Sequence, residues 1–313
     1  MTKAWWLQKE VILPLALKTA TKMNTHAETT KGRSNRNLYT EITLYFVLAY
    51  AISWVMWLPL YGAKLGLSQL PTIPFNHAIG AWGPMLAAFI MTWWKGGKGA
   101  LTTLLKQCIR TGAWWYALIA LFSPFVLVAL AALIDHFQNG VVFSISGVLH
   151  YAEFPELNIL TFFIYNLAFF GLGEEIGWRG YALPRLQVKM NALTAAILLT
   201  IFWALWHVPL FLYRPGYMSM GIAGMVGWVL SLATGSILLS WLYNATKAGI
   251  LTCAIFHSTI DVAFTADFAD TSVVGNMGML ITVWGILTIA ILRPKNLSKS
   301  GKVLPDNATS NRD

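Results

Sequence analysis

The sequence predicts an all-α protein, a polytopic membrane bundle of about eight transmembrane helices. Composition carries this prediction, because 57% of the 313 residues are hydrophobic, only 11% are charged and the mean hydropathy is +0.58. A helix needs roughly 20 consecutive apolar residues to cross a bilayer. Apolar runs of about that length lie at 42–62, 76–94, 114–134, 158–178, 193–213, 222–243, 248–266 and 275–292.

The positive charges predict the orientation of these helices. With a cytoplasmic N-terminus, all of the 22 Lys and Arg residues except Lys64 and Arg214 fall on segments predicted to lie inside. Cytoplasmic loops of membrane proteins carry such an excess, so we expect a multi-pass cell-membrane protein with both termini cytoplasmic. The net charge of +9 then reflects topology and contact with the lipid bilayer, and we expect no nucleic-acid partner.

One integral membrane domain is expected over residues 41–293, flanked by polar tails. Residues 1–40 are predicted to be a basic cytoplasmic tail, for which an interfacial amphipathic helix and a disordered chain both stay open. Residues 294–313 are rich in Lys, Ser, Asn and Asp, which predicts a disordered cytoplasmic tail. The basic segment 95–113 has leucines at helical spacing and predicts a short helix on the cytoplasmic surface.

Residues 173–179, Gly-Glu-Glu-Ile-Gly-Trp-Arg, are the main functional signal. They place two adjacent carboxylates at the end of an apolar run, and ionisable groups at membrane depth are costly and mark functional sites by default. Glu175 and Arg179 are four residues apart, the spacing of a helical ion pair, so we predict a mainly structural role for them. Glu174 is then the carboxylate available to exchange a proton with water.

Three more ionisable residues interrupt later apolar runs: His207, His257 and Asp261. An antiparallel hairpin that turns at 190–191 would bring Glu174 and His207 level, each on the order of 20–25 Å from the turn. His257 and Asp261, at i and i+4, share one face of their helix at a similar depth of about 15–20 Å. Four ionisable side chains at one level predict a polar intramembrane cavity open to the cytoplasm.

These residues closely resemble those of the CPBP family of intramembrane proteases (CAAX proteases and bacteriocin-processing enzymes, the Abi family), related to the type II CAAX prenyl endopeptidases. The family pattern is Glu-Glu-x-x-x-Arg, then Phe-x-x-x-His, then His-x-x-x-Asn or Asp. The corresponding segments of this chain run from Glu174 to Arg179, from Trp203 to His207 and from His257 to Asp261. The resemblance covers about 80–265, and it departs from the pattern at Trp203, where the family has Phe.

The resemblance implies a peptide hydrolase, an intramembrane endopeptidase. In it Glu174, with His207, would activate a water, while His257 and Asp261 would stabilise the oxyanion. Membrane-embedded, membrane-anchored or lipidated peptides and proteins are the implied substrates. The residues expected to support the site are Glu175, Arg179 and Trp203.

The role of Asp261 stays open at this point. An ionised Asp cannot donate a hydrogen bond to an oxyanion as Asn can, so Asp261 is protonated, orients His257, or binds a cation. A related alternative is a divalent metal such as zinc held by Glu174, His207, His257 and Asp261. A metal-free glutamate mechanism is equally consistent with the sequence.

Two other function classes compete with the protease. The same fold without catalysis would be a membrane scaffold or a bacteriocin-immunity protein. An ion-coupled transporter is less favoured, because transporters often show inverted repeats and broken helix pairs, and the sequence shows neither.

Overall fold

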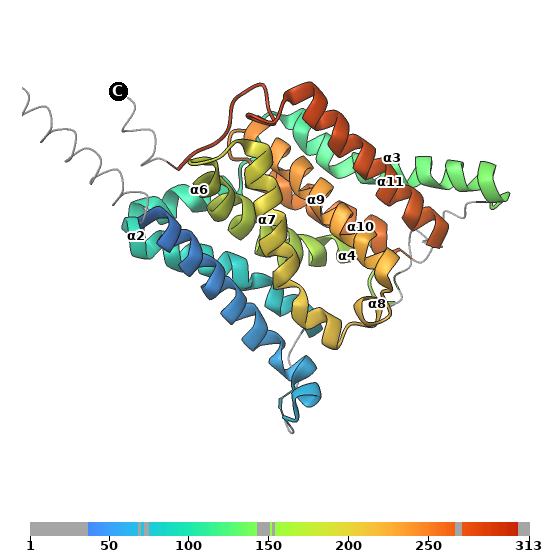
Figure 1. Ribbon diagram of the computed structural model, residues 1–313, viewed down its shortest axis with the longest axis horizontal. Coiled ribbons are helices and arrows are strands. Elements are labelled where there is room, and N and C mark those ends of the chain that lie inside the picture. Colours follow the sequence, from blue (N-terminus) through green and yellow to red (C-terminus); the bar gives the residue numbers. More distant parts are fainter. Residues whose placement is uncertain are drawn as a thin grey trace, which may run out of the picture. The chain divides into compact units, whose positions relative to one another are not determined.

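The computed structural model describes residues 37–67, 70–71, 75–142, 151, 154–266 and 271–305. The chain divides into two compact units, Met1–Leu44 and Tyr45–Asp313. The first unit is described only over its helical residues 37–44, and the whole candidate site belongs to the second. The described residues form helices and turns without any strand, which confirms the predicted all-α class (Figure 1).

Within the described ranges, six helices are long and apolar enough to cross a membrane. They are Asn37–Leu65, Trp114–Asn139 (α3), Ile159–Gln187, Ala192–Leu212, Ile222–Ala245 (α9) and Ser272–Leu292, which is most of α11 (Thr271–Leu292). The run predicted at 248–266 forms α10 (Ile250–Thr265), which is apolar but shorter. These helices confirm a multi-pass membrane protein.

The run predicted as a span at 76–94 is built differently. It begins as a 3-10 helix, η2 (Asn76–Trp82), and continues as α2 (Gly83–Cys108). Gly97 interrupts α2 with φ 63° and ψ −160°, a conformation that glycine adopts at little cost. The basic segment is helical on both sides of this break, up to Cys108, and α2 is not among the six long apolar helices of the described ranges.

The helix Ile159–Gln187 carries the glutamates and contains two π-helical turns. Its parts are α4 (Ile159–Asn166), η4 (Leu167–Gly171), α5 (Leu172–Gly177), η5 (Trp178–Ala182) and α6 (Leu183–Gln187), of which η4 and η5 are π-helical. π-turns are rare and frequently occur at functional sites. Here they flank both ends of α5, the segment that contains Glu174 and Glu175.

A tight turn joins this helix to α7 (Ala192–Trp206) close to the predicted residues 190–191. The Asn191 side chain caps α7 by accepting a hydrogen bond from Thr194 N at 2.8 Å. After α7 come η6 (Val208–Leu212), α8 (Pro215–Met218), α9, α10 and α11. α2 packs on α5, α10 packs on α3, and α9 contacts both α7 and α11 (Figure 1).

The prediction of a disordered tail from residue 294 is wrong for residues 294–305, which we call the C-terminal segment. Lys302 Nζ donates to the carbonyl oxygens of Gln187 (2.6 Å) and Met190 (2.9 Å), and Val303 N donates to Asn244 Oδ1 (2.9 Å). Helix ends leave backbone groups without partners inside the helix. Hydrogen bonds near the ends of α6 and α9 therefore help to fix this segment, and Leu297, which is fully buried against Ala192, Ala196 and Ile237, anchors it in the core. Residues 1–36 and 306–313 of the predicted tails lie outside the described residues.

Candidate active site

Glycines allow the neighbouring helices to approach α5 closely. A Cβ atom at Gly171 would lie 2.6 Å from the carbonyl oxygen of Ala254 on α10. A Cβ atom at Gly177 would lie 2.5 Å from the Cβ atom of Pro84 on α2. Side chains at these two positions would force the helices apart, so glycine is what lets α2 and α10 enclose α5. Both glutamates of α5 are buried as a result.

Glu174 is held by neutral donors. Its Oε2 atom accepts a hydrogen bond from Trp203 Nε1 at 2.7 Å and another from Trp178 Nε1 at 3.2 Å. Its Oε1 atom accepts none from the described part of the chain. The carboxylate is 3% exposed. Glu174 thus has a fixed orientation and one oxygen left for another partner.

Glu175 is held by basic groups. Its Oε1 atom lies 2.8 Å from Arg179 Nη1 and 2.8 Å from Nδ1 of His257 on α10. Glu175 and Arg179 are both completely buried, which agrees with the predicted helical ion pair. The guanidinium carbon of Arg179 also lies 4.9 Å from the centroid of the Trp203 ring, in a cation–π contact. The ion pair therefore reaches beyond α5 and fixes the His257 imidazole.

His207 follows directly after α7 and lies among aromatic rings. Its Nδ1 atom is 2.7 Å from the carbonyl oxygen of Trp203, which leaves Nε2 free of that contact. The ring lies 4.8 Å from Trp206, 5.6 Å from Trp228 of α9 and 6.2 Å from Tyr217 of α8, with which it is nearly parallel. Pro209, the second residue of η6, prevents α7 from continuing, because proline lacks the N–H of a helical hydrogen bond and its ring clashes with the preceding turn.

Asp261 is the most accessible of the four predicted catalytic residues. Its Oδ2 atom lies 3.6 Å from His257 Nε2, too far for a good hydrogen bond, and its side chain is 32% exposed. The shorter contact to His257 comes from Glu175. The orientation of the imidazole is therefore set mainly by Glu175, and Asp261 contributes a weaker, more open contact.

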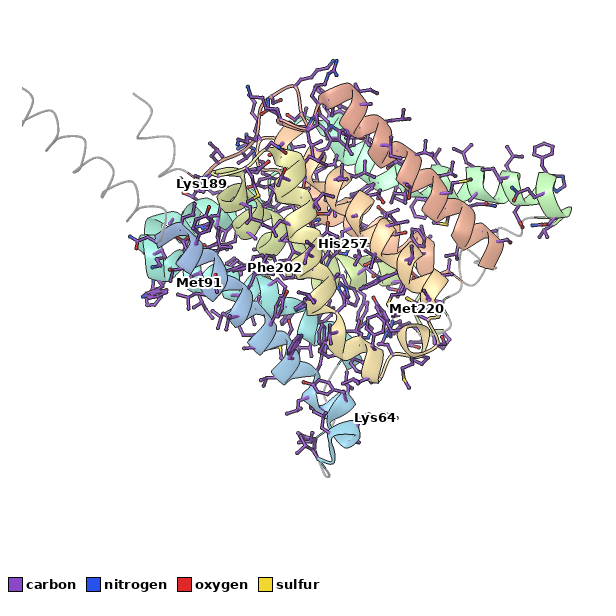
Figure 2. All side chains as sticks on the ribbon, in the orientation of Figure 1. Lys64, Met91, Lys189, Phe202, Met220 and His257 are labelled. Carbon is purple, nitrogen blue, oxygen red and sulfur yellow. The ribbon has the colours of Figure 1, made fainter. Side chains whose placement is uncertain are left out.

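Trp203 connects these groups. Its indole nitrogen bonds Glu174, its carbonyl oxygen contacts His207, and its ring packs edge-on against His257 at 5.5 Å. Asp261 joins the group through His257, whose Nε2 lies 3.6 Å from Asp261 Oδ2. The structure therefore brings all four predicted residues into one neighbourhood. In the view of Figure 2, His257 lies in the interior of the bundle, between Lys189 and Met220.

The four residues do not form a metal-binding set. In the described ranges, no three His, Cys, Asp or Glu side chains are placed to hold a metal ion. A zinc site needs three or four such ligands. As placed among the described residues, these side chains do not form a metal site, and no step proposed below uses a metal.

The sequence did not predict Trp178, Tyr217 and Trp228 as part of the site. Trp178 has the i,i+4 spacing to Glu174 that would have identified it, whereas Tyr217 and Trp228 come together only through tertiary packing. The predicted polar cavity around the four residues stays a prediction. A cavity of about 630 Å³ that the structure shows lies elsewhere, and none of the four lines it.

Two comparisons with known proteins agree with the motifs. Residues 156–263 match the family model described as type II CAAX prenyl endopeptidase Rce1-like. A curated relative, CAAX prenyl protease 2 of Methanococcus maripaludis, is 26% identical over 231 residues, which are 70% of this chain and 82% of the relative. All three motifs lie inside the matched segment. The segment 156–263 is thus similar to the Rce1-like, type II CAAX prenyl endopeptidases, and the chain is a membrane peptide hydrolase of the CAAX-protease type.

Proposed function

We propose that the chain is an intramembrane endopeptidase in which Glu174 activates water. The observation that carries this proposal is the asymmetry of the Glu174 carboxylate. Two indole N–H groups fix Oε2, while Oε1 accepts no hydrogen bond from the described residues. A carboxylate that is held in place with one open oxygen can bind a water molecule and take its proton.

His207 completes the water site in this proposal. Because Nδ1 faces the Trp203 carbonyl oxygen, we assign the ring hydrogen to Nδ1 and leave Nε2 as an acceptor. A water held between Glu174 and His207 would attack the carbonyl carbon of the scissile peptide bond. Glu174 would take the proton as the C–O bond forms and return it to the nitrogen as the C–N bond breaks.

We assign stabilisation of the oxyanion, the negatively charged substrate oxygen, to His257. Glu175 holds its Nδ1, and Arg179 in turn holds Glu175, so the imidazole cannot turn away. In the imidazolium form, whose Nδ1–H donates to Glu175, the Nε2–H would donate to the substrate oxygen as negative charge develops there, an interaction that lowers the reaction barrier. Glu175 and Arg179 act as positioning residues, because they reach the substrate only through His257.

The substrate class follows from the setting of the site. The four residues lie on helices of a membrane bundle, so the scissile bond belongs to a membrane-embedded or membrane-anchored peptide. The name of the curated relative adds a narrower class, peptides that end in a prenylated CAAX sequence. We propose this class as the first to test.

The decisive experiment compares Glu174→Gln with a matched control, Glu156→Gln. Glu156 is exposed in the turn before α4, so its change alters the same chemical group outside the site. Purified wild type and Glu156→Gln should cleave a farnesylated CAAX peptide, whereas Glu174→Gln should not. Equal processing of membrane peptides by cells that contain wild type or Glu174→Gln would instead favour the scaffold or immunity interpretation.

We further propose that both termini are cytoplasmic, on the distribution of Lys and Arg described above. The test is a pair of reporter fusions, one at Arg293 and one near Lys64. The fusion at Arg293 should report the cytoplasm and the fusion near Lys64 the opposite side. An extracytoplasmic signal at Arg293 would reverse the side from which substrate reaches the site.

A further inference from the structure

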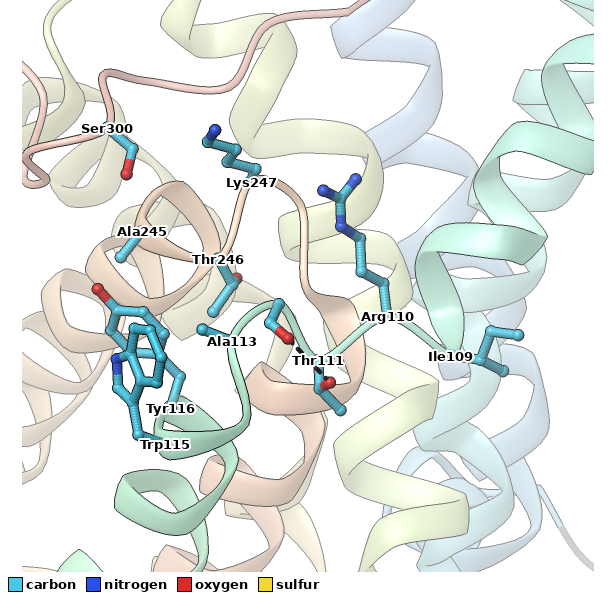
Figure 3. Close-up of a pocket in the computed structure, with 11 residues that line it drawn as sticks. Ile109, Arg110, Thr111, Ala113, Trp115, Tyr116, Ala245, Thr246, Lys247 and Ser300 are labelled. Carbon is cyan, nitrogen blue, oxygen red and sulfur yellow. Dashed lines mark hydrogen bonds between the residues drawn. The ribbon is translucent and has the colours of Figure 1, made fainter.

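A cavity lies away from the candidate active site. It has a volume of about 630 Å³, within the roughly 300–1,000 Å³ that is typical of ligand pockets. Its walls come from the loop between α2 and α3, the start of α3, the turn after α9 and Ser300 of the C-terminal segment (Figure 3). The proposed peptidase chemistry uses none of these residues.

The cavity carries two cations without anionic partners. Arg110 and Lys247 both line it, and both are exposed. Neither forms a salt bridge with any residue in the described part of the chain, and no Asp or Glu lines the cavity. In the view of Figure 3 both side chains point to the same side. Two neighbouring positive charges repel, so an anion between them would be stabilised.

The backbone around these cations is fixed in place. Leu251 N donates to the carbonyl oxygen of Arg110 at 3.2 Å, and Thr252 Oγ1 donates to that of Thr111 at 2.7 Å. Lys247 has φ 52°, in the left-handed region that non-glycine residues rarely occupy. Backbone strain of this kind clusters at ligand sites. The spacing of Arg110 and Lys247 is therefore set by tertiary structure.

The opposite part of the cavity is aromatic. Trp115 and Tyr116 line it with ring centroids 5.8 Å apart, and Trp115 is exposed. Both residues belong to the first turn of α3, a helix long and apolar enough to span the membrane. Tryptophan and tyrosine favour the interface between lipid and water. The cavity thus has a cationic part and an aromatic part at the end of a membrane span.

We propose that this cavity binds the phosphate of an anionic phospholipid headgroup. Arg110 and Lys247 pair with the phosphate oxygens, and Trp115 and Tyr116 contact the glycerol and upper acyl region. A zwitterionic choline headgroup binds less well, because its ammonium group meets the same two cations. Ser300 forms part of the wall, so a bound headgroup also contacts the C-terminal segment.

The test is lipid binding by the full-length protein in detergent, measured by native mass spectrometry with phosphatidylglycerol as the probe. Arg110→Gln with Lys247→Gln removes both cations. The matched control is Lys98→Gln with Lys106→Gln, which removes two exposed charges of α2 that do not line the cavity. We expect the dissociation constant to rise roughly fivefold for each cation lost from the cavity, and to stay near the wild-type value in the control.

Further measurements distinguish a lipid ligand from soluble phosphate, and a loss of binding from a loss of folding. Phosphatidylcholine should bind more weakly than phosphatidylglycerol, and inorganic phosphate should not displace phosphatidylglycerol. The charge-preserving pair Arg110→Lys with Lys247→Arg should bind as the wild type does. Unchanged phosphatidylglycerol binding in the double glutamine variant would overturn the site, and full displacement by inorganic phosphate would overturn the lipid. Neither outcome depends on peptidase activity.

Discussion

Two adjacent glutamates of α5 lie in contrasting surroundings. On one side, Glu174 accepts hydrogen bonds only from the neutral indole groups of Trp178 and Trp203, as far as the described residues go. On the other side, Glu175 contacts the guanidinium of Arg179 and the imidazole of His257 through one oxygen atom. Both carboxylates are buried to nearly the same extent.

The difference between the two glutamates shows that holding a carboxylate in place and compensating its charge are separate tasks, done by different kinds of partner. Neutral N–H donors hold a carboxylate in place without cancelling its charge, so Glu174 stays able to accept a proton. Basic partners compensate the charge of Glu175 and make the pair costly to break, because the remaining charge would be buried alone. We therefore expect chemistry from the first glutamate and architecture from the second.

The largest expected effects come from exchanging the two carboxylates for amides in turn. Glu174→Gln keeps the size of the side chain but cannot take a proton, so peptidase activity should fall about 10²–10⁴-fold while the protein still accumulates. Glu175→Gln leaves Arg179 without its anionic partner and should lower the free energy of unfolding by about 3–5 kcal/mol. Activity per folded molecule and thermal unfolding in detergent measure the two effects.

The assignment of chemistry to Glu174 and architecture to Glu175 would be contradicted if the two variants showed each other's expected phenotype. A poorly accumulating Glu174→Gln beside a stable, inactive Glu175→Gln would make Glu175 the chemical group. In that case the Arg179 contact would serve to tune its charge rather than to stabilise α5.

A smaller effect is expected from the indole donors. Trp203→Phe keeps an aromatic ring but removes the 2.7 Å hydrogen bond to Glu174, and the turnover number should fall about tenfold with little change in KM. Trp178→Phe removes the longer 3.2 Å bond and should cost less. Trp241→Phe in α9 contacts neither glutamate and serves as the control. Equal losses in all three variants would show that packing, rather than the N–H donors, matters.

Local spacing predicted one part of this site and tertiary contacts made the rest. The Glu175–Arg179 pair follows from i,i+4 geometry, and the turn predicted at 190–191 lies beside Asn191, the N-cap of α7. The bond between Glu175 and His257 joins residues 82 positions apart, which no helical period reveals. Because of this bond, Glu175 has two partners: it pairs with Arg179, and it also orients His257, the residue proposed to stabilise the oxyanion.

The C-terminal segment shows a similar limit of sequence patterns. Its polar composition predicted disorder, yet Lys302 and Val303 find partners near the ends of other helices. Backbone groups at helix ends lack partners inside the helix, so they can bind a polar segment, and the single buried Leu297 adds an apolar contact. Composition cannot report that match, because the partners are brought together by the fold.

The smallest expected effect concerns Asp261. It tests what the long contact between Asp261 and His257 Nε2 contributes to activity. Asp261→Asn removes an anionic oxygen but keeps the shape, and its amide can donate a hydrogen bond near the oxyanion. Because Glu175 already orients His257 at 2.8 Å and Asp261 lies 3.6 Å away, the variant should keep or exceed wild-type activity. His257→Ala, measured beside it, should lose about 10²–10³-fold if it supplies the oxyanion contact.

The same measurement with and without EDTA tests the metal alternative at Asp261. Resistance of the wild type to EDTA, together with an active Asp261→Asn, would agree with the glutamate mechanism and with side chains that are not placed as a metal site in the described residues. An inactive Asp261→Asn and an EDTA-sensitive wild type that added zinc restores would contradict both. Glu174, His207, His257 and Asp261 would then have to move together to form a ligand set, and the neutral surroundings of Glu174 would mark a metal ligand rather than a base.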